Sequence, residues 1–180
     1  GSLHAVGLSV SVAEGSARYV PLAHMVGPDL NLHPGRVVEV LTSLEAAGAP
    51  LIWYHFKFDG QVCQDCFGWA LRTDATAIHW DDAMIAVYLE NSNIKELGLK
   101  ATAKRLLRIR MRAYEETTQG QNFSALHPME AVLYACADAD MTRRIFLLPK
   151  VQEAIREQSL IYKIERLLVP VIWKGIRAGV

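Results

Sequence analysis

The sequence is poor in cysteine, lacks long apolar runs and carries no excess charge of either sign. Its three cysteines are too few, and odd in number, for a disulfide framework, which favours a reducing compartment. No apolar run approaches the ~18 residues of a membrane span, and residues 1–4 show no signal-peptide pattern. Nineteen basic residues balance nineteen acidic ones, which argues against binding nucleic acid by bulk electrostatics alone. We therefore expect an intracellular protein without a membrane partner, in the cytoplasm, in a virus-infected cytoplasm or in an organelle.

Two of the cysteines, Cys63 and Cys66, form a C-x-x-C pair. A structural zinc site needs four ligands, and no second pair follows at zinc-finger spacing. We therefore interpret the pair as buried thiols, with a metal or redox site as the alternative.

The pattern of apolar residues predicts an α/β domain with a mixed sheet flanked by helices. With 51% apolar residues in a chain of 180, the protein can bury a substantial core. The all-apolar run 51–54 follows a proline and predicts a strand buried on both faces. The other predicted elements are a hairpin at 6–12 and 18–22, a helix from Pro34, a helix at 59–67, a strand at 77–80, and helices at 81–90, 94–107, 129–148 and 151–175.

Tyr134 and Asp138 are four residues apart on a predicted helix, so they share one face. Met141 and Ile145 continue that face as an apolar stripe. A carboxylate inside such a stripe is costly unless a divalent metal or an arginine pairs with it. A phenol one turn away could orient a water molecule beside the metal. The alternative is a structural carboxylate that caps a loop or pairs with a neighbouring arginine.

Three further acids lie where a strand meets a helix. Asp59 follows the buried strand 51–54, and residues at that end of a sheet point into the usual ligand crevice of α/β folds. The alternative for Asp59 is a helix N-cap. Asp81 and Asp82 open the next helix, where one is expected to cap it and the other to favour the helix dipole.

A basic run precedes the irregular segment 108–127, and it includes Lys104 and Arg105. These side chains could follow a phosphate backbone. The alternative is a solvated helix end. The histidines at 24, 55 and 127 are interpreted as core or surface residues rather than ligands.

These signals occur in an order that resembles the 3′→5′ exonuclease (proofreading) domain of family A DNA polymerases. Tyr54 to Asp59 resembles the second exonuclease motif, N-x-x-x-D, and Trp80 to Leu89 resembles a segment that reads F-D-T-M in the family. Tyr134 to Asp140 closely matches the third motif, Y-x-x-x-D. The hairpin at 6–24 also resembles the family, and 168–171 with 179–180 resembles the junction into the polymerase domain.

The resemblance implies a ribonuclease H-like fold and hydrolysis of phosphodiester bonds at a single-stranded DNA 3′ end, assisted by two ions of Mg²⁺ or Mn²⁺. It implies metal binding by Asp59 and Asp138, with Asp82 as the acid that matches F-D-T-M. Besides Lys104 and Arg105, predicted from the basic run, the resemblance adds His55 as a nucleic-acid contact, and Tyr134 would position the attacking water. It also implies an exonuclease-like domain over residues 1–160, the start of the connection to a polymerase domain over 161–180, and that polymerase domain as a partner in the same chain.

Two positions depart from the family pattern. His55 stands where the family usually has asparagine. The family's first motif, D-x-E, which supplies two of its four carboxylates from the first strand of the sheet, does not occur before the hairpin. Either a longer protein carries that strand, or the motif has been lost. We expect residues 1–180 alone to lack nuclease activity and to bind metal weakly.

Three functions remain open on the sequence. The first is a metal-dependent exonuclease within a DNA-synthesising polymerase. The second is a catalytically dead scaffold or DNA-binding module with the same fold. The third is a stand-alone RNA-trimming exonuclease, against which the polymerase-like segment at the C-terminal end argues.

Overall fold

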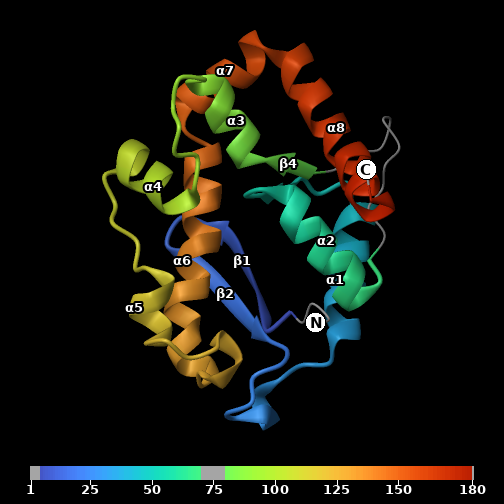
Figure 1. Cartoon of the computed structure of the whole chain (residues 1–180), viewed down its shortest axis with the longest axis vertical. Helices are drawn as coiled ribbons and strands as arrows, with labels where there is room; N and C mark the ends of the chain where they lie inside the picture. Colours follow the sequence, from blue (N-terminus) through green and yellow to red (C-terminus); the bar gives the residue numbers. More distant parts are fainter. Residues whose placement is uncertain (1–4, 70–79, 180) are drawn as a thin grey trace.

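The computed structural model describes residues 5–69 and 80–179 of the chain. Within those ranges, the chain forms two pairs of strands and eight α-helices, and the long helix α6 (Pro128–Phe146) runs through the middle of the molecule (Figure 1). The predicted α/β class is therefore confirmed. No helix in the described ranges is long and apolar enough to cross a membrane.

The predicted hairpin is formed by β1 (Gly7–Ala13) and β2 (Ser16–Pro21), which pair antiparallel with Leu8 opposite Val20. Close approach fixes glycine at position 7, because a Cβ there would lie 2.1 Å from the Tyr19 hydroxyl oxygen. That hydroxyl lies 2.7 Å from Nε2 of His24, whose Nδ1 lies 2.7 Å from the Leu126 carbonyl oxygen. His24 is therefore a satisfied core residue, as expected.

A second, parallel pair consists of β3 (Leu51–Trp53) and β4 (Trp80–Asp82), with Ile52 opposite Asp81. The buried run 51–54 thus forms a strand, as predicted. The other predicted strand begins only at Trp80, and 77–79 lie outside the described residues. Among the described residues, the expected mixed sheet is present as two separate two-stranded ladders, one antiparallel and one parallel.

The helices before α6 are short, and the segment predicted to be irregular, 108–127, is irregular only in part, because it contains α5 (Tyr114–Thr118) and a 3₁₀ turn. The short helices are α1 (Pro34–Ala46), α2 (Phe56–Phe67), α3 (Ala83–Glu90), α4 (Leu99–Leu107) and α5, with single 3₁₀ turns at Pro28–Leu30 and Phe123–Ala125. Helix α6 packs against β1, β2 and β3, and also against α3 and α4. It therefore connects both strand pairs to the helices.

Several helix boundaries differ from the prediction. Helix α2 begins at Phe56, before the predicted 59, and α4 begins at Leu99, after the predicted 94. Helix α6 ends at Phe146 because Leu148 precedes Pro149, and a residue before proline avoids the helical region. The single helix predicted at 151–175 is two helices, α7 (Pro149–Glu157) and α8 (Ser159–Ala178). The break falls at Gln158, whose side-chain amide donates to the Leu89 carbonyl at the end of α3. A tertiary contact therefore overrides the helical pattern.

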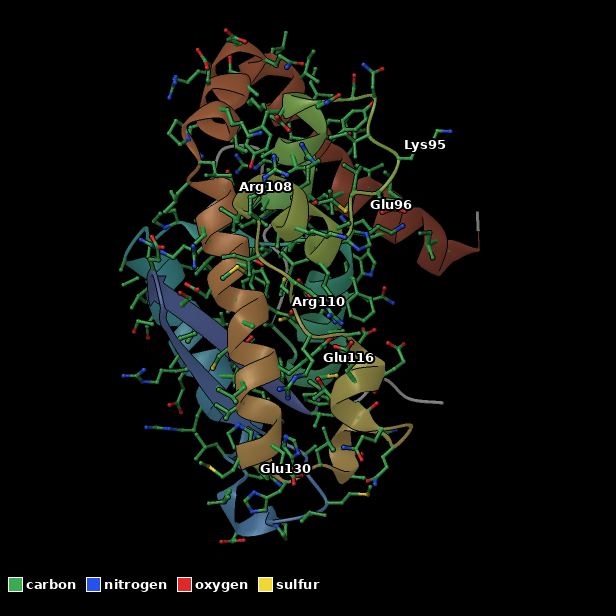
Figure 2. The ribbon with its side chains drawn as sticks, turned by 90° about the vertical axis from the view of Figure 1, so that its left-hand side faces the viewer. Lys95, Glu96, Arg108, Arg110, Glu116 and Glu130 are labelled. Carbon is green, nitrogen blue, oxygen red and sulfur yellow. The ribbon has the colours of Figure 1, made fainter. Side chains whose placement is uncertain are left out.

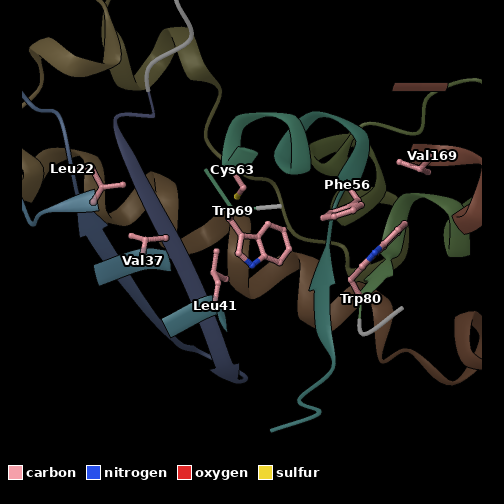
Figure 3. Close-up of a cluster of buried hydrophobic side chains, with 8 residues drawn as sticks. All are labelled: Leu22, Val37, Leu41, Phe56, Cys63, Trp69, Trp80 and Val169. Carbon is pink, nitrogen blue, oxygen red and sulfur yellow. The ribbon is translucent and has the colours of Figure 1, made fainter. Parts of the chain in front are cut away.

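The main core cluster joins α1, α2, β4 and α8 (Figure 3). Phe56 and Trp80 stack at its centre with ring centroids 3.9 Å apart. Cys63 is 2% exposed in this cluster, and burial raises its thiol pKa to about 12, so it is an uncharged core residue, as expected. Helix α8 spans the expected boundary at 160/161 and buries Tyr162 and Val169 in the core.

Candidate active site

The turn between β3 and α2 places Asp59. His55 is the N-cap of α2 and has φ 64° and ψ 57°, in the left-handed region. Asparagine and histidine are both enriched there, so a backbone reason accounts for either residue at this position. Because α2 begins at Phe56, Asp59 lies within its first turn. The alternative that Asp59 is the N-cap is therefore wrong.

Asp82 holds that turn together. Its carboxylate accepts hydrogen bonds from the backbone N–H groups of His55 at 3.2 Å and Phe56 at 2.7 Å. It also caps α3 by accepting from Met84 at 2.8 Å and Ile85 at 3.4 Å. Asp82 is only 1% exposed, and burial raises its pKa, while the four backbone donors oppose that rise. The predicted capping role is confirmed.

The neighbouring Asp81 is also paired. Its Oδ1 accepts from the Tyr162 hydroxyl at 3.0 Å and lies 3.0 Å from a guanidinium nitrogen of Arg166. Both partners come from α8, so Asp81 and Asp82 tie β4 to α8 and to the start of α2. These two acids are satisfied by protein groups.

Tyr134 and Asp138 lie on one face of α6, and the stripe beyond them is buried at Met141 and Ile145, as predicted. Oδ1 of Asp138 is buried and makes no hydrogen bond. Arg144, one of the arginines that could have paired with Asp138, instead lies 3.1 Å from Glu14 and 3.6 Å from Asp140. Oδ1 of Asp138 is thus a buried polar atom without a hydrogen-bond partner, which is the kind of atom that a ligand-binding site requires.

The charge of Asp138 acts on Asp59 although the two lie far apart in sequence. Burial, with smaller contributions from the negative charges of Asp82 and Asp138, raises the pKa of Asp59 to about 7. Burial also raises the pKa of Asp138 to about 6, against the opposing charge of Lys100. These two carboxyl groups therefore share one region in which a second negative charge is costly.

A cavity of about 200 Å³ opens beside this region. Tyr134, Asp138 and Arg112 contribute its polar groups, and Met111, Leu133 and Ala137 complete its lining. Asp59 and Asp82 are not among the lining residues. The cavity thus joins the predicted tyrosine and aspartate of α6 to a basic residue from the segment before α5.

The donor chemistry fits a hard divalent cation, because carboxylates are the ligands that Mg²⁺ and Mn²⁺ prefer. A cation would relieve the repulsion between Asp59 and Asp138 and would satisfy the bare oxygen of Asp138. In the described part of the chain, however, no three His, Cys, Asp or Glu side chains are grouped so that they could hold a metal. The described residues therefore fall short of the ligand set that two ions need.

The predicted nucleic-acid residues have different surroundings. His55 and Lys104 are exposed. Arg105 is partly buried and forms an ion pair with Glu90 at 2.9 Å, which differs from the solvated helix end given as the alternative. Farther along the basic run, Arg110 lies 2.7 Å from Glu116 beside α5 (Figure 2). The binding, catalytic and metal roles assigned from the sequence stay predictions.

Sequence reasoning missed Lys100. Its amine donates to the Tyr134 hydroxyl at 2.9 Å and lies 4.4 Å from the centre of the ring. The signal that could have found it is its position in the first turn of α4, where the helix dipole disfavours a cation. A lysine in the first turn of a helix needs a partner from another element of the fold to offset this cost.

Comparison with solved structures defines the class of fold. A structure titled as the apo form of a nuclease superposes with a TM-score of 0.69 at 18% sequence identity, over 96% of this chain and 76% of that chain. The shared fold fits the predicted ribonuclease H-like class. No family model matches the chain.

Among curated proteins, the chain is similar to DNA polymerase I of Borreliella burgdorferi (strain ATCC 35210 / DSM 4680 / CIP 102532 / B31). The two are 24% identical over 162 residues, which is 89% of this chain and 17% of the relative. The chain thus spans about a sixth of that polymerase. The resemblance to DNA polymerase I that the motifs predict is confirmed, and the fold is nuclease-like.

Proposed function

We propose that this chain is the 3′→5′ exonuclease (proofreading) domain of a family A DNA polymerase. The observation that carries the proposal is the buried Oδ1 of Asp138, which makes no hydrogen bond. Asp138 comes from the third motif of the resemblance, and its charge contributes to the raised pKa of Asp59, which comes from the second motif. Tyr134 lies one helical turn from Asp138 at a cavity, where the third motif requires a tyrosine.

In this proposal Asp59 and Asp138 hold Mg²⁺ or Mn²⁺. A bound ion of this kind would lower the pKa of a water nucleophile and stabilise the leaving oxygen. Tyr134 donates its phenol hydrogen to the water or to the scissile phosphate and so sets the direction of attack. Arg112, which also lines the cavity, offers a positive charge to the phosphate backbone.

Asp82 is the third acid proposed for the metal. Its carboxylate already accepts four backbone hydrogen bonds, which favours a different contribution. By closing the turn at His55 and Phe56, Asp82 fixes the start of α2 and hence the place of Asp59 on its first turn. We therefore favour Asp82 as a positioning residue over Asp82 as a ligand.

The proposed substrate is the single-stranded 3′ end of DNA, which the exposed His55 and Lys104 would contact. Arg105 is less available for this contact because it forms an ion pair with Glu90. The proposed partner is a polymerase domain in the same chain, reached through a connection that begins at about residue 161 in α8. The proposed location is inside the cell. The complete site further requires the D-x-E pair of the first motif, which residues 1–180 do not contain.

One observation favours a second candidate, a catalytically dead exonuclease fold that serves as a scaffold or DNA-binding module. Within the described ranges, the acids do not reach the number that two ions require. The sequence of the natural protein upstream of Gly1 separates the two candidates. A strand with D-x-E there supports the enzyme, and its absence supports the scaffold.

The activity test is release of mononucleotides from 3′-labelled single-stranded DNA by the natural protein with Mg²⁺ or Mn²⁺. Asp59→Ala and Asp138→Ala should each abolish release. Glu153→Ala, on the exposed side of α7, is the matched control and should cut like the wild type. An inactive wild-type protein that carries an intact D-x-E pair would refute the proposal and leave the scaffold.

A further inference from the structure

Lys100 has an unusual position for a lysine. It is the second residue of α4, which begins after the N-cap Gly98. Backbone N–H groups and the positive end of the dipole are concentrated there, so a cation is unfavourable unless a partner offsets the cost. The partner is on α6, because the Lys100 amine lies 2.9 Å from the Tyr134 hydroxyl oxygen and 4.4 Å from the ring centre.

The ring of Tyr134 is held from its other sides by aromatic residues. Tyr114 meets it edge-on with centroids 6.2 Å apart, and Phe123 packs at 5.7 Å. The two neighbours limit the motion of the ring, and the lysine fixes its oxygen. An ammonium group has only hydrogens to give, so the phenol oxygen is the acceptor in this bond. The phenol hydrogen is thereby left as a donor for another group.

Lys100 also acts electrostatically on the acid of the same site. Its charge opposes the rise that burial causes in the pKa of Asp138. One amine therefore touches the tyrosine of the third motif and acts electrostatically on its aspartate. Both residues line the same cavity.

Resting on the proposed exonuclease function, we propose that Lys100 is a positioning residue of the nuclease site, which fixes the Tyr134 phenol as a donor into the cavity that Tyr134 and Asp138 line. Lys100 thus orients the tyrosine before substrate binds. The competing interpretation is that Lys100 has a purely structural role and only joins α4 to α6.

The kinetic test uses the natural protein, with Lys100→Met, Lys100→Arg and Tyr134→Phe compared on 3′-labelled single-stranded DNA. Lys100→Met should lower kcat roughly tenfold to hundredfold and change KM by less than about twofold, because positioning acts on the transition state. Lys100→Arg should recover part of kcat, because arginine keeps the charge and the donor. Adding Lys100→Met to Tyr134→Phe should cost at most about threefold more, because the residues act as a unit.

A second readout does not depend on cutting. Manganese binding, followed by electron paramagnetic resonance, should tighten by roughly threefold to tenfold in Lys100→Met, because a positive charge beside a carboxylate ligand is removed. Asp138→Asn should weaken it. If Lys100 only joined α4 to α6, Lys100→Met would leave manganese binding unchanged or weaker and would lower the melting temperature.

The outcomes separate the two proposals. A wild-type protein that does not cut refutes the exonuclease function, and the role of Lys100 with it. A wild-type protein that cuts, with an unchanged kcat in Lys100→Met, refutes the role of Lys100 alone. Fully additive effects of Lys100→Met and Tyr134→Phe, or weaker manganese binding in Lys100→Met, would likewise overturn it.

Discussion

Two pairs of aspartates in this fold have different surroundings. Asp81 and Asp82 lie at the end of β4, where backbone N–H groups, Tyr162 and Arg166 meet their oxygens. Asp59 lies on α2 and Asp138 on α6, the charge of Asp138 contributes to the raised pKa of Asp59, and the buried Oδ1 of Asp138 has no hydrogen-bond donor. The first pair is satisfied by protein groups and stabilises the fold. The second pair includes a buried oxygen without a protein partner, and this difference marks the candidate site.

Asp82→Ala should produce the largest loss of stability. It removes the acceptor of four backbone N–H groups and leaves several of them buried without a partner. The free energy of unfolding should fall by about 3–5 kcal/mol, as measured by urea denaturation. Asp82→Asn keeps one acceptor oxygen and should lose less than half as much. If Asp82→Ala costs no more than Asp138→Ala, the contrast between the two pairs is wrong.

The pH dependence of stability should reveal the unsatisfied pair. The pKa of Asp59 in the folded protein is about 7 against an ordinary value of 3.8, so folding favours its protonated form. This group therefore adds stability that is fully present below about pH 4 and is lost as the pH rises through about 7. Asp59→Asn should remove roughly 1–3 kcal/mol of that decline.

The measurement is urea denaturation from pH 4 to pH 8, with the variant subtracted from the wild type. The subtraction cancels groups common to both proteins, such as Glu90, whose pKa is lowered by its hydrogen bonds with Arg105 and Lys150 against a rise from burial. A flat difference curve would mean that Asp59 titrates normally and that no shared acidic site exists.

Cation binding should have the smallest effect on stability. A cation at Asp59 and Asp138 binds the folded state alone, so Mn²⁺ at ten times its dissociation constant should raise the free energy of unfolding by about 1.4 kcal/mol. The gain should be greater at pH 8 than at pH 5, since the cation competes with protons for both carboxylates. Calorimetry of the wild type against Asp138→Asn measures it. An equal gain in both proteins would place the cation elsewhere.

Local rules predicted much of this fold. The apolar run 51–54, the stripe of α6 and the capping acid before α3 all follow from patterns within a few residues. Tertiary contacts decided the rest: the Gln158 amide separates α7 from α8 by binding the end of α3. The expected single mixed sheet appears as two ladders among the described residues, which no local pattern could distinguish.

The candidate site was predictable in part for the same reason. Tyr134 and Asp138 share one helix, so their spacing reveals their common face. Asp59 was assigned to the same site only because the order of the motifs resembles that of a known family. Lys100 was not predicted at all, because its contact crosses from α4 to α6. The sequence does not show that Asp81 and Asp82 are hydrogen-bonded whereas Oδ1 of Asp138 is not, because this depends on partners from other parts of the fold.

The central claim is that Asp138 is kept for catalysis and not for folding. The most direct test measures two properties of Asp138→Asn in the natural protein: release of mononucleotides from a 3′-labelled strand and the free energy of unfolding at pH 7.5. The account predicts a loss of cutting of at least about 10³-fold, on the scale of removing one member of a catalytic unit, with stability equal to or greater than that of the wild type. Retained cutting, or a loss explained by unfolding, would contradict it.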